Sequence, residues 1–253
     1  MASEVEKILD DANTLLNNGE LSDAEALLRN LLRKNTSNLQ CLLQLIQVLL
    51  VRERWADALD ITDRLAALTR DAQITRLYRA HIFSEVGRKD DASHEVSLLS
   101  YDNLPNGVRA LWFDVLLNKL GRVKQGVAVG KKHFKDLQPA SLKLLLFAAV
   151  RVGEAEFARK CGERLISTGV DDIEIRRALY SLEIGVGSSD LARQHLRAFS
   201  TEQNLPFNQD FEDELARIES MQFAFMHAPK TSGTSSRKTI DQIGANLSHR
   251  AIK

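Results

Sequence analysis

The stretch NNGELSDAEALLRNLL, residues 17–32, combines a glycine, an alanine five positions later and leucines at three- and four-residue spacing. Gly19 can adopt the left-handed conformation in which many helices end. The leucines from Leu27 onward line one face of the helix that follows. The small side chain of Ala24 allows that helix to pack closely against the helix before the turn. The stretch therefore predicts the turn and the second helix of a helical hairpin.

The same pair of positions, a turn residue followed five residues later by a small residue, recurs along the chain. It is found at Gly19 and Ala24, Glu53 and Ala58, Gly87 and Ala92, Gly121 and Gly126, Gly153 and Ala158, and Gly187 and Ala192. Successive turn positions are 34, 34, 34, 32 and 34 residues apart. A period of this length indicates repeats that bury their apolar faces against their neighbours.

Two units depart from the pattern. Glu53 stands where the other turns have glycine, so this turn is predicted to be strained or capped differently. Gly126 replaces the alanine of the fourth unit and costs about 1 kcal/mol of helix propensity. In three units an aspartate, Asp23, Asp57 or Asp91, falls in the opening turn of the second helix, where negative charge suits the helix dipole.

A 34-residue helix–turn–helix with this spacing resembles the tetratricopeptide repeat over residues 3–201. The resemblance implies an all-α fold: a tetratricopeptide-type α-solenoid of about six helix–turn–helix repeats, occupying residues 1–201. In that family the first helices line a concave face that binds a peptide or a partner helix. The implied partner is a protein or peptide, and a second copy of the chain, giving a homodimer, is also possible.

The candidate partner-binding residues lie on the first helices. The family's best-known carboxylate clamp is matched only by Asn13, so we do not expect that clamp. The polar residues predicted to face a partner are Asn13, Gln40, Gln44, Gln47, Arg76, Arg79 and His81. An ordinary solvated helix face is the alternative interpretation. Trp55, Trp112 and Phe113 are expected to pack between helices.

Composition excludes several classes of partner. Thirty-four basic residues balance thirty-four acidic ones, so nothing indicates nucleic acid or an anionic membrane as a partner. No apolar run approaches the ~18 residues of a membrane span, and the N-terminus is no secretory signal, so a cytoplasmic protein is expected. Cys41 and Cys161 are predicted to be packed thiols. Neither these cysteines nor His81 and His94 have metal-ligand spacing, so no metal site is expected.

The repeat pattern ends near Ser200. Residues 202–220 read as a connector with a short acidic helix, FEDELARIES, and residues 221–253 as a short C-terminal strand–loop–helix fragment. The apolar residues 221–226 predict the strand, and residues 235–247, SSRKTIDQIGANL, predict the helix. A small-residue loop between a strand and a helix can hold a phosphate with its backbone N–H groups.

That loop, HAPKTSGTS at residues 227–235, closely resembles the phosphosulfate-binding loop of sulfotransferases. The resemblance implies that Lys230 is catalytic and stabilises the leaving group. The implied ligand in a full-length protein is 3′-phosphoadenosine 5′-phosphosulfate, held by Lys230, Thr231, Ser232, Gly233, Thr234 and Ser235. The family's second phosphate site and general base normally follow the loop, where only residues 240–253 remain. We therefore expect a truncated first βα unit that binds no cofactor and is inactive by itself. A disordered polar tail matching by chance is the alternative.

Two functions stay open. The chain is either the protein–protein interaction module of a tetratricopeptide-repeat sulfotransferase with a truncated catalytic domain, or a non-enzymatic adaptor that binds a peptide or partner protein. The sequence leaves open the partner, the sulfate acceptor, the oligomeric state and whether the chain is a fragment, a truncated product or complete.

Overall fold

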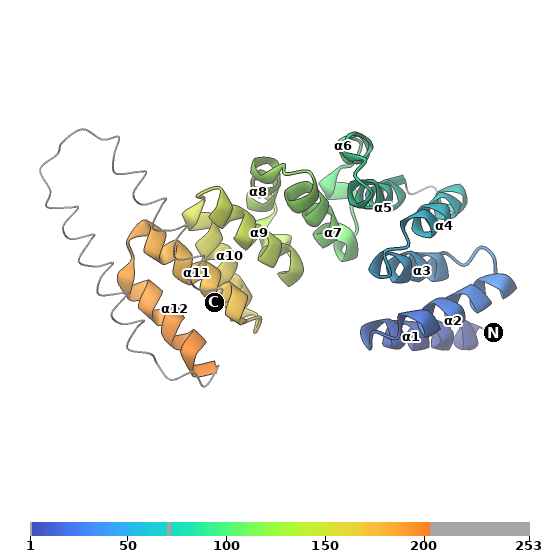
Figure 1. Ribbon diagram of the computed structural model, residues 1–253, viewed down its shortest axis with the longest axis horizontal. Coiled ribbons are helices and arrows are strands. Elements are labelled where there is room, and N and C mark those ends of the chain that lie inside the picture. The colour runs from blue at the N-terminus through green and yellow to red at the C-terminus, as the bar shows by residue number, and fades with distance from the viewer. Residues whose placement is uncertain (1, 70–71, 203–253) are drawn as a thin grey trace, which may run out of the picture. The chain divides into compact units, whose positions relative to one another are not determined.

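The computed structural model describes residues 2–69 and 72–202, which are all-α (Figure 1). The α-helices in this part of the chain are α1 (Ala2–Asn17), α2 (Leu21–Lys34), α3 (Leu39–Val51), α4 (Trp55–Leu68), α5 (Ala72–Glu85), α6 (Lys89–Ser97), α7 (Arg109–Asp114), α8 (Val123–Lys132), α9 (Pro139–Arg151), α10 (Ala155–Ser167), α11 (Ile173–Val186) and α12 (Ser189–Glu202). Short 3₁₀ segments η1 (Tyr101–Asn103), η2 (Asn106–Val108) and η4 (Phe134–Asp136) and the π-helical segment η3 (Val115–Lys119) complete the described structure.

The helices of the described residues pair into six hairpins, which confirms the predicted α-solenoid of about six repeats. Each pair is an odd-numbered helix followed by the next even-numbered one, from α1 and α2 to α11 and α12, and α7 with η3 acts as one first helix. The chain divides into two compact units, residues 1–126 and residues 127–253. The strand, the phosphate-type loop and the helix predicted beyond residue 202 lie outside the described residues.

All six predicted turn residues have a positive φ. The values are 81° for Gly19, 56° for Glu53, 80° for Gly87, 66° for Gly121, 75° for Gly153 and 82° for Gly187. Among the described residues Glu53 is the one non-glycine residue in this region. Its turn has the same closing hydrogen bond as the first turn: Arg54 N donates to Leu49 O over 2.9 Å, as Glu20 N donates to Leu15 O over 2.9 Å. Of the two alternatives for Glu53, the strained turn with an unchanged cap is therefore the one observed.

The small residues lie buried where the two helices of each hairpin meet. Ala24, Ala58, Ala92, Ala158 and Ala192 are each 0% exposed. Gly126 is also buried, and a Cβ placed there would lie 2.4 Å from Leu117 Cδ2. Close helix packing therefore explains these positions, and a methyl group at Gly126 would require the Leu117 side chain to shift.

The fourth hairpin has an irregular first helix. After α7 the backbone continues as the π-helical turn η3, in which Leu120 N donates to Val115 O over 2.9 Å. Arg122 N consequently bonds to Leu116 O, six residues back, whereas the other turns bond five residues back. The π turn thus shifts the helix by one residue while the left-handed turn at Gly121 is kept.

Aromatic side chains pack together between η1 and this helix. The ring centroids of Tyr101, Trp112 and Phe113 lie 5.1–5.4 Å apart. Trp112 and Phe113 are 4% and 0% exposed, which confirms their predicted role in packing.

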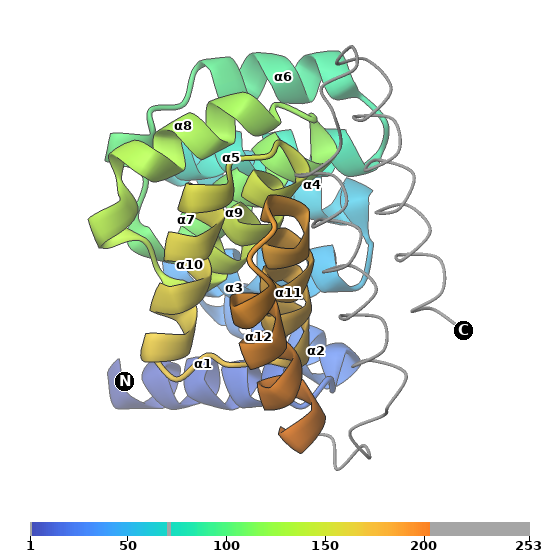
Figure 2. The same ribbon diagram turned by 90° about the vertical axis from the view of Figure 1, so that its left-hand side faces the viewer.

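In the second unit, close packing joins α10 to α11, and α11 lies beside α12 (Figure 2). A Cβ at Gly162 would lie 2.6 Å from Leu179 Cδ2. Glu183, which is 0% exposed, accepts hydrogen bonds of 2.8 and 2.9 Å from Arg159. Cys161 here and Cys41 in the first unit are buried free thiols, as predicted.

Candidate partner-binding site

The first helices of the second, third and fourth hairpins enclose one cavity in the first unit. Its volume is about 330 Å³ and its lining residues are Gln47, Leu50 and Val51 of α3, Tyr78 and His81 of α5, and Gly107, Val108 and Leu111 at the start of the fourth hairpin. We call it the α3–α5 cavity. The surface of α1, α3, α5 and α7 is called the first-helix face.

Two of the predicted residues, Gln47 and His81, meet in this cavity although they are 34 positions apart in the sequence. The apolar lining was not predicted. Val51, 59% exposed, and the partly buried Leu111 are its main unforeseen members. The sequence offered one signal for this lining: apolar residues such as Val51 stand near the predicted polar position Gln47 on the same helix.

His81 is mostly enclosed, since its side chain is 12% exposed. Its ring meets Trp55 edge-on with centroids 6.2 Å apart. Its Nδ1 is buried and has no hydrogen-bond partner among the described residues, and its Nε2 lies 3.9 Å from Glu85 Oε1. Burial lowers the pKa of His81, against the opposing effect of Glu85 and Asp114. The imidazole is therefore neutral at neutral pH.

Two other contacts shape the first-helix face. Burial raises the pKa of Tyr78, and a hydrogen bond with Gln47 opposes that rise, so α3 and α5 are joined at the cavity wall. Gln44 Nε2 donates to Leu9 O over 3.2 Å and joins α3 to α1, while its Oε1 is buried and has no partner within residues 2–69 and 72–202. Gln44 therefore positions the helices around the site.

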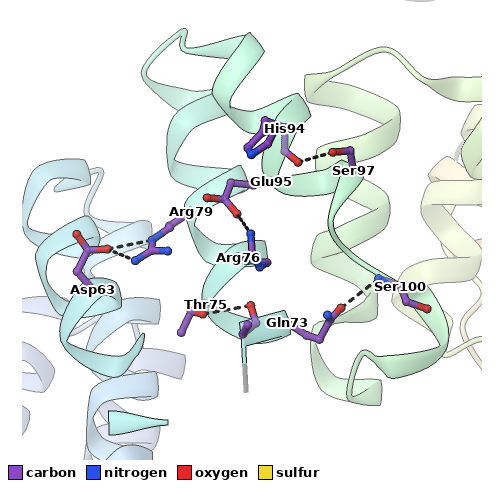
Figure 3. Close-up of polar contacts among 10 residues, drawn as sticks. Asp63, Gln73, Thr75, Arg76, Arg79, His94, Glu95, Ser97 and Ser100 are labelled. Atoms are coloured by element: carbon purple, nitrogen blue, oxygen red, sulfur yellow. Dashed lines mark hydrogen bonds and ion pairs between the residues drawn. The ribbon is translucent and has the colours of Figure 1, made fainter. Parts of the chain in front are cut away.

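Arg76 and Arg79 form ion pairs with second helices (Figure 3). Arg79 Nη2 lies 2.6 Å from Asp63 Oδ1 of α4, and Arg76 Nη1 lies 3.1 Å from Glu95 Oε2 of α6. Both guanidinium groups thus contribute to packing in the free protein, and the partner-binding role predicted for them stays a prediction.

The remaining predicted residues do not join the cavity. Asn13 and Gln40 are exposed on α1 and α3. Lys230 and residues 231–235 lie outside the described residues. Over residues 2–69 and 72–202 there is no group of three histidine, cysteine or acidic side chains placed to hold a metal ion. No helix in that part of the chain is long and apolar enough to cross a bilayer.

Comparison with known proteins supports the repeat fold. A family model described as tetratricopeptide repeat matches residues 15–81, the stretch that contains both Gln47 and His81. A solved structure of Pseudomonas aeruginosa pilF matches with a TM-score of 0.57 and 16% identity, over 84% of this chain and 96% of that chain. With the six hairpins, these matches show a tetratricopeptide-type α-solenoid. No curated protein matches in sequence.

Two further solved structures resemble the chain more loosely. A tetratricopeptide repeat protein from Parabacteroides merdae is 16% identical, with a TM-score of 0.46 over 95% of this chain and 97% of that chain. The TPR domain of P58(IPK) is 17% identical, with a TM-score of 0.40 over 88% of this chain and 66% of that chain. The family match does not extend to residues 227–235, so the sulfotransferase relation stays a prediction.

Proposed function

We propose that the chain is a protein–protein interaction module whose first-helix face binds an extended peptide or a helix of a partner protein. The observation that carries this proposal is the meeting of Gln47 and His81 in one cavity, two residues that the repeat register and the family resemblance had placed on first helices. A concave, mostly apolar site with a few polar groups is the usual form of a binding site. At about 330 Å³ the α3–α5 cavity has room for an apolar side chain of a peptide.

The chemistry of the lining favours a peptide. Val51 at the end of α3 is 59% exposed, and covering it would contribute about 1 kcal/mol of hydrophobic stabilisation. The exposed amide of Gln47 can donate to and accept from a peptide backbone.

The experiment is a selection of peptides from a phage-displayed library on the immobilised full chain, followed by fluorescence anisotropy on the purified peptides. The test variant is Val51→Glu, which places a charge at the cavity wall. Leu68→Glu is the matched control, because Leu68 is the last residue of α4, as Val51 is of α3, and is 43% exposed.

We expect peptides with a bulky apolar residue and a Kd below about 100 μM. Val51→Glu should weaken them about tenfold or more, and Leu68→Glu less than about twofold. A selection that yields no binding peptide, or equal losses in both variants, would contradict the proposal.

A second candidate function has its own support in the motif HAPKTSGTS at residues 227–235. We propose that the module serves a sulfotransferase and brings an acceptor or partner to it, with 3′-phosphoadenosine 5′-phosphosulfate as the cofactor of the full-length protein. The coding DNA after Lys253 distinguishes the two: an open frame with a sulfotransferase-like domain supports this function, and a stop codon in a verified transcript favours the non-enzymatic adaptor.

Calorimetry tests the chain itself. We expect weak or no binding of 3′-phosphoadenosine 5′-phosphate, because a second phosphate site is expected only downstream of the loop. Micromolar binding would show that the chain carries a complete cofactor site.

A further inference from the structure

A second cavity in the first unit lies between α2 and α4 and shares no residue with the α3–α5 cavity. Its volume is about 560 Å³, and its lining combines the arginines Arg29, Arg33 and Arg64 with the apolar Leu32, Leu45 and Ile61. We call it the α2–α4 groove. Cationic groups thus surround an apolar floor.

The charge of this groove is not neutralised within the described residues. Arg33 donates to Asn30 Oδ1 and Arg64 donates to the backbone oxygen of Thr36, and both acceptors are neutral. Neither arginine has a carboxylate at ion-pair distance in this part of the chain. Arg29 lies 2.6 Å from Glu25 Oε1, but that carboxylate also contacts Arg52 and Arg54. The groove therefore carries a net positive charge, with planar groups suited to bidentate contact with a carboxylate.

The floor of the groove selects among anionic ligands. Leu32 and Ile61 are 5% and 6% exposed, and Leu45 lies beneath them at 0%. A nucleic acid or another polyanion without apolar groups would satisfy the arginines and leave this floor uncovered. An acidic peptide with a leucine-like side chain between its carboxylates matches both parts of the lining.

We propose that the α2–α4 groove is a second docking surface, which binds an acidic peptide segment of a partner protein with an apolar residue between its carboxylates. The peptide that binds here is independent of the ligand of the first-helix face. With both surfaces occupied, the protein would hold two partner segments at once.

The probe is a fluorescein-labelled peptide of glutamates and aspartates that carries leucines at three- and four-residue spacing. One control peptide has serine at every leucine, and a second has glutamine and asparagine at every acid. The protein variant is Arg33→Glu in the full chain. Lys34→Glu is the matched control, because Arg33 and Lys34 both lie in the last turn of α2 and only Arg33 lines the groove.

Anisotropy should show saturable binding of the acidic leucine peptide that weakens as salt is raised. Arg33→Glu should weaken it about tenfold, from the loss of charged hydrogen bonds, and Lys34→Glu less than about twofold. Both control peptides should bind at least about tenfold more weakly. Hydrogen exchange should slow in α2 and α4 when the probe is bound.

Four outcomes would overturn the proposal. Equal losses in Arg33→Glu and Lys34→Glu would indicate non-specific attraction to net charge. Equal binding of the serine peptide, or tighter binding of a single-stranded RNA oligonucleotide, would identify an anion surface instead of a peptide groove. No binding of the probe at about 1 mM would show that the groove is not a docking site for an acidic peptide.

Discussion

Arg54 Nη1 lies 2.6 Å from Glu25 Oε1, a contact that ties the turn of the second hairpin to α2 of the first. Arg52 Nη1 lies 2.5 Å from the other oxygen of the same carboxylate. The two arginines flank Glu53, the non-glycine turn residue with φ 56°. Two ion pairs to one buried acid therefore hold the strained turn in place, on either side of the strained residue.

Glu53→Gly should stabilise the protein by about 1 kcal/mol, because glycine adopts the left-handed conformation without steric cost. Gly19→Ala is the reciprocal control: φ is 81° there and no atom lies within 4 Å of an added Cβ, so the backbone alone is tested. We expect that variant to lose about 1 kcal/mol. Urea unfolding measures the free energy of unfolding of both variants. A loss of stability in Glu53→Gly would show that the turn is not strained.

Glu25→Gln should destabilise the first unit by about 2 kcal/mol, because three guanidinium groups lose their buried charged acceptor. The control Glu156→Gln removes an exposed pair with Lys160 and should leave stability unchanged.

The effect of Glu25 should depend on pH. Burial raises the pKa of Glu25, but hydrogen bonds and charges from Arg29 and Arg54 outweigh this and leave it below its ordinary value of 4.5. Because the folded-state pKa is the lower one, the stabilisation is present above about pH 4.5 and is lost as pH falls through the folded-state value. The difference in free energy of unfolding between wild type and Glu25→Gln should shrink over that range. A constant difference down to pH 2 would contradict a lowered pKa for Glu25.

Gly126→Ala should destabilise the protein by about 1 kcal/mol, although alanine favours helices, because its Cβ would lie 2.4 Å from Leu117 Cδ2 in a packed core. Gly185→Ala is the matched control, since Gly185 lies within α11 with nothing within 4 Å of an added Cβ. That substitution should stabilise by about 0.5–1 kcal/mol. Thermal unfolding of both variants shows whether each substitution raises or lowers stability. A gain in stability in Gly126→Ala would mean that the fourth hairpin is loosely packed.

His81 should make the first unit sensitive to mild acid. Burial lowers its pKa below the ordinary 6.5, so the unfolded chain binds the proton more readily than the folded one. Stability should fall as pH drops below about 6.5, and His81→Phe, which keeps an aromatic ring beside Trp55, should remove that part of the loss. Denaturant midpoints of wild type and variant between pH 7.5 and 5 provide the measurement. Parallel curves would show that His81 does not titrate differently on folding.

The repeat architecture could be predicted from the sequence because its positions tolerate few residue types. A left-handed turn favours glycine, and a tight helix crossing requires a small side chain. Gly19 therefore indicates the turn, and Ala24 indicates the close helix contact that follows it. Even the exception at Glu53 was visible as a break in the pattern, and its strain followed from the same rule.

The candidate site was predictable only in part, because side-chain partners depend on how hairpins stack. Gln47, Arg79 and His81 all lie on first helices, as predicted, and their partner-binding role stays a prediction. The sequence did not indicate that Arg79 pairs with Asp63 on another helix, or that Glu25 pairs with Arg52, 27 positions further along the chain. The π turn of η3 also escaped prediction, because a one-residue shift in hydrogen bonding leaves no mark in the apolar pattern.

Nuclear magnetic resonance mapping of a selected peptide on the isotope-labelled full chain tests the central claim most directly. We predict that amide shifts on titration cluster in α3, in α5 and at residues 107–111, around Val51 and His81. The same titration with Val51→Glu should require about tenfold more peptide. Shifts confined to residues outside these three segments, with α3 and α5 unaffected, would contradict the assignment of the first-helix face as the binding surface.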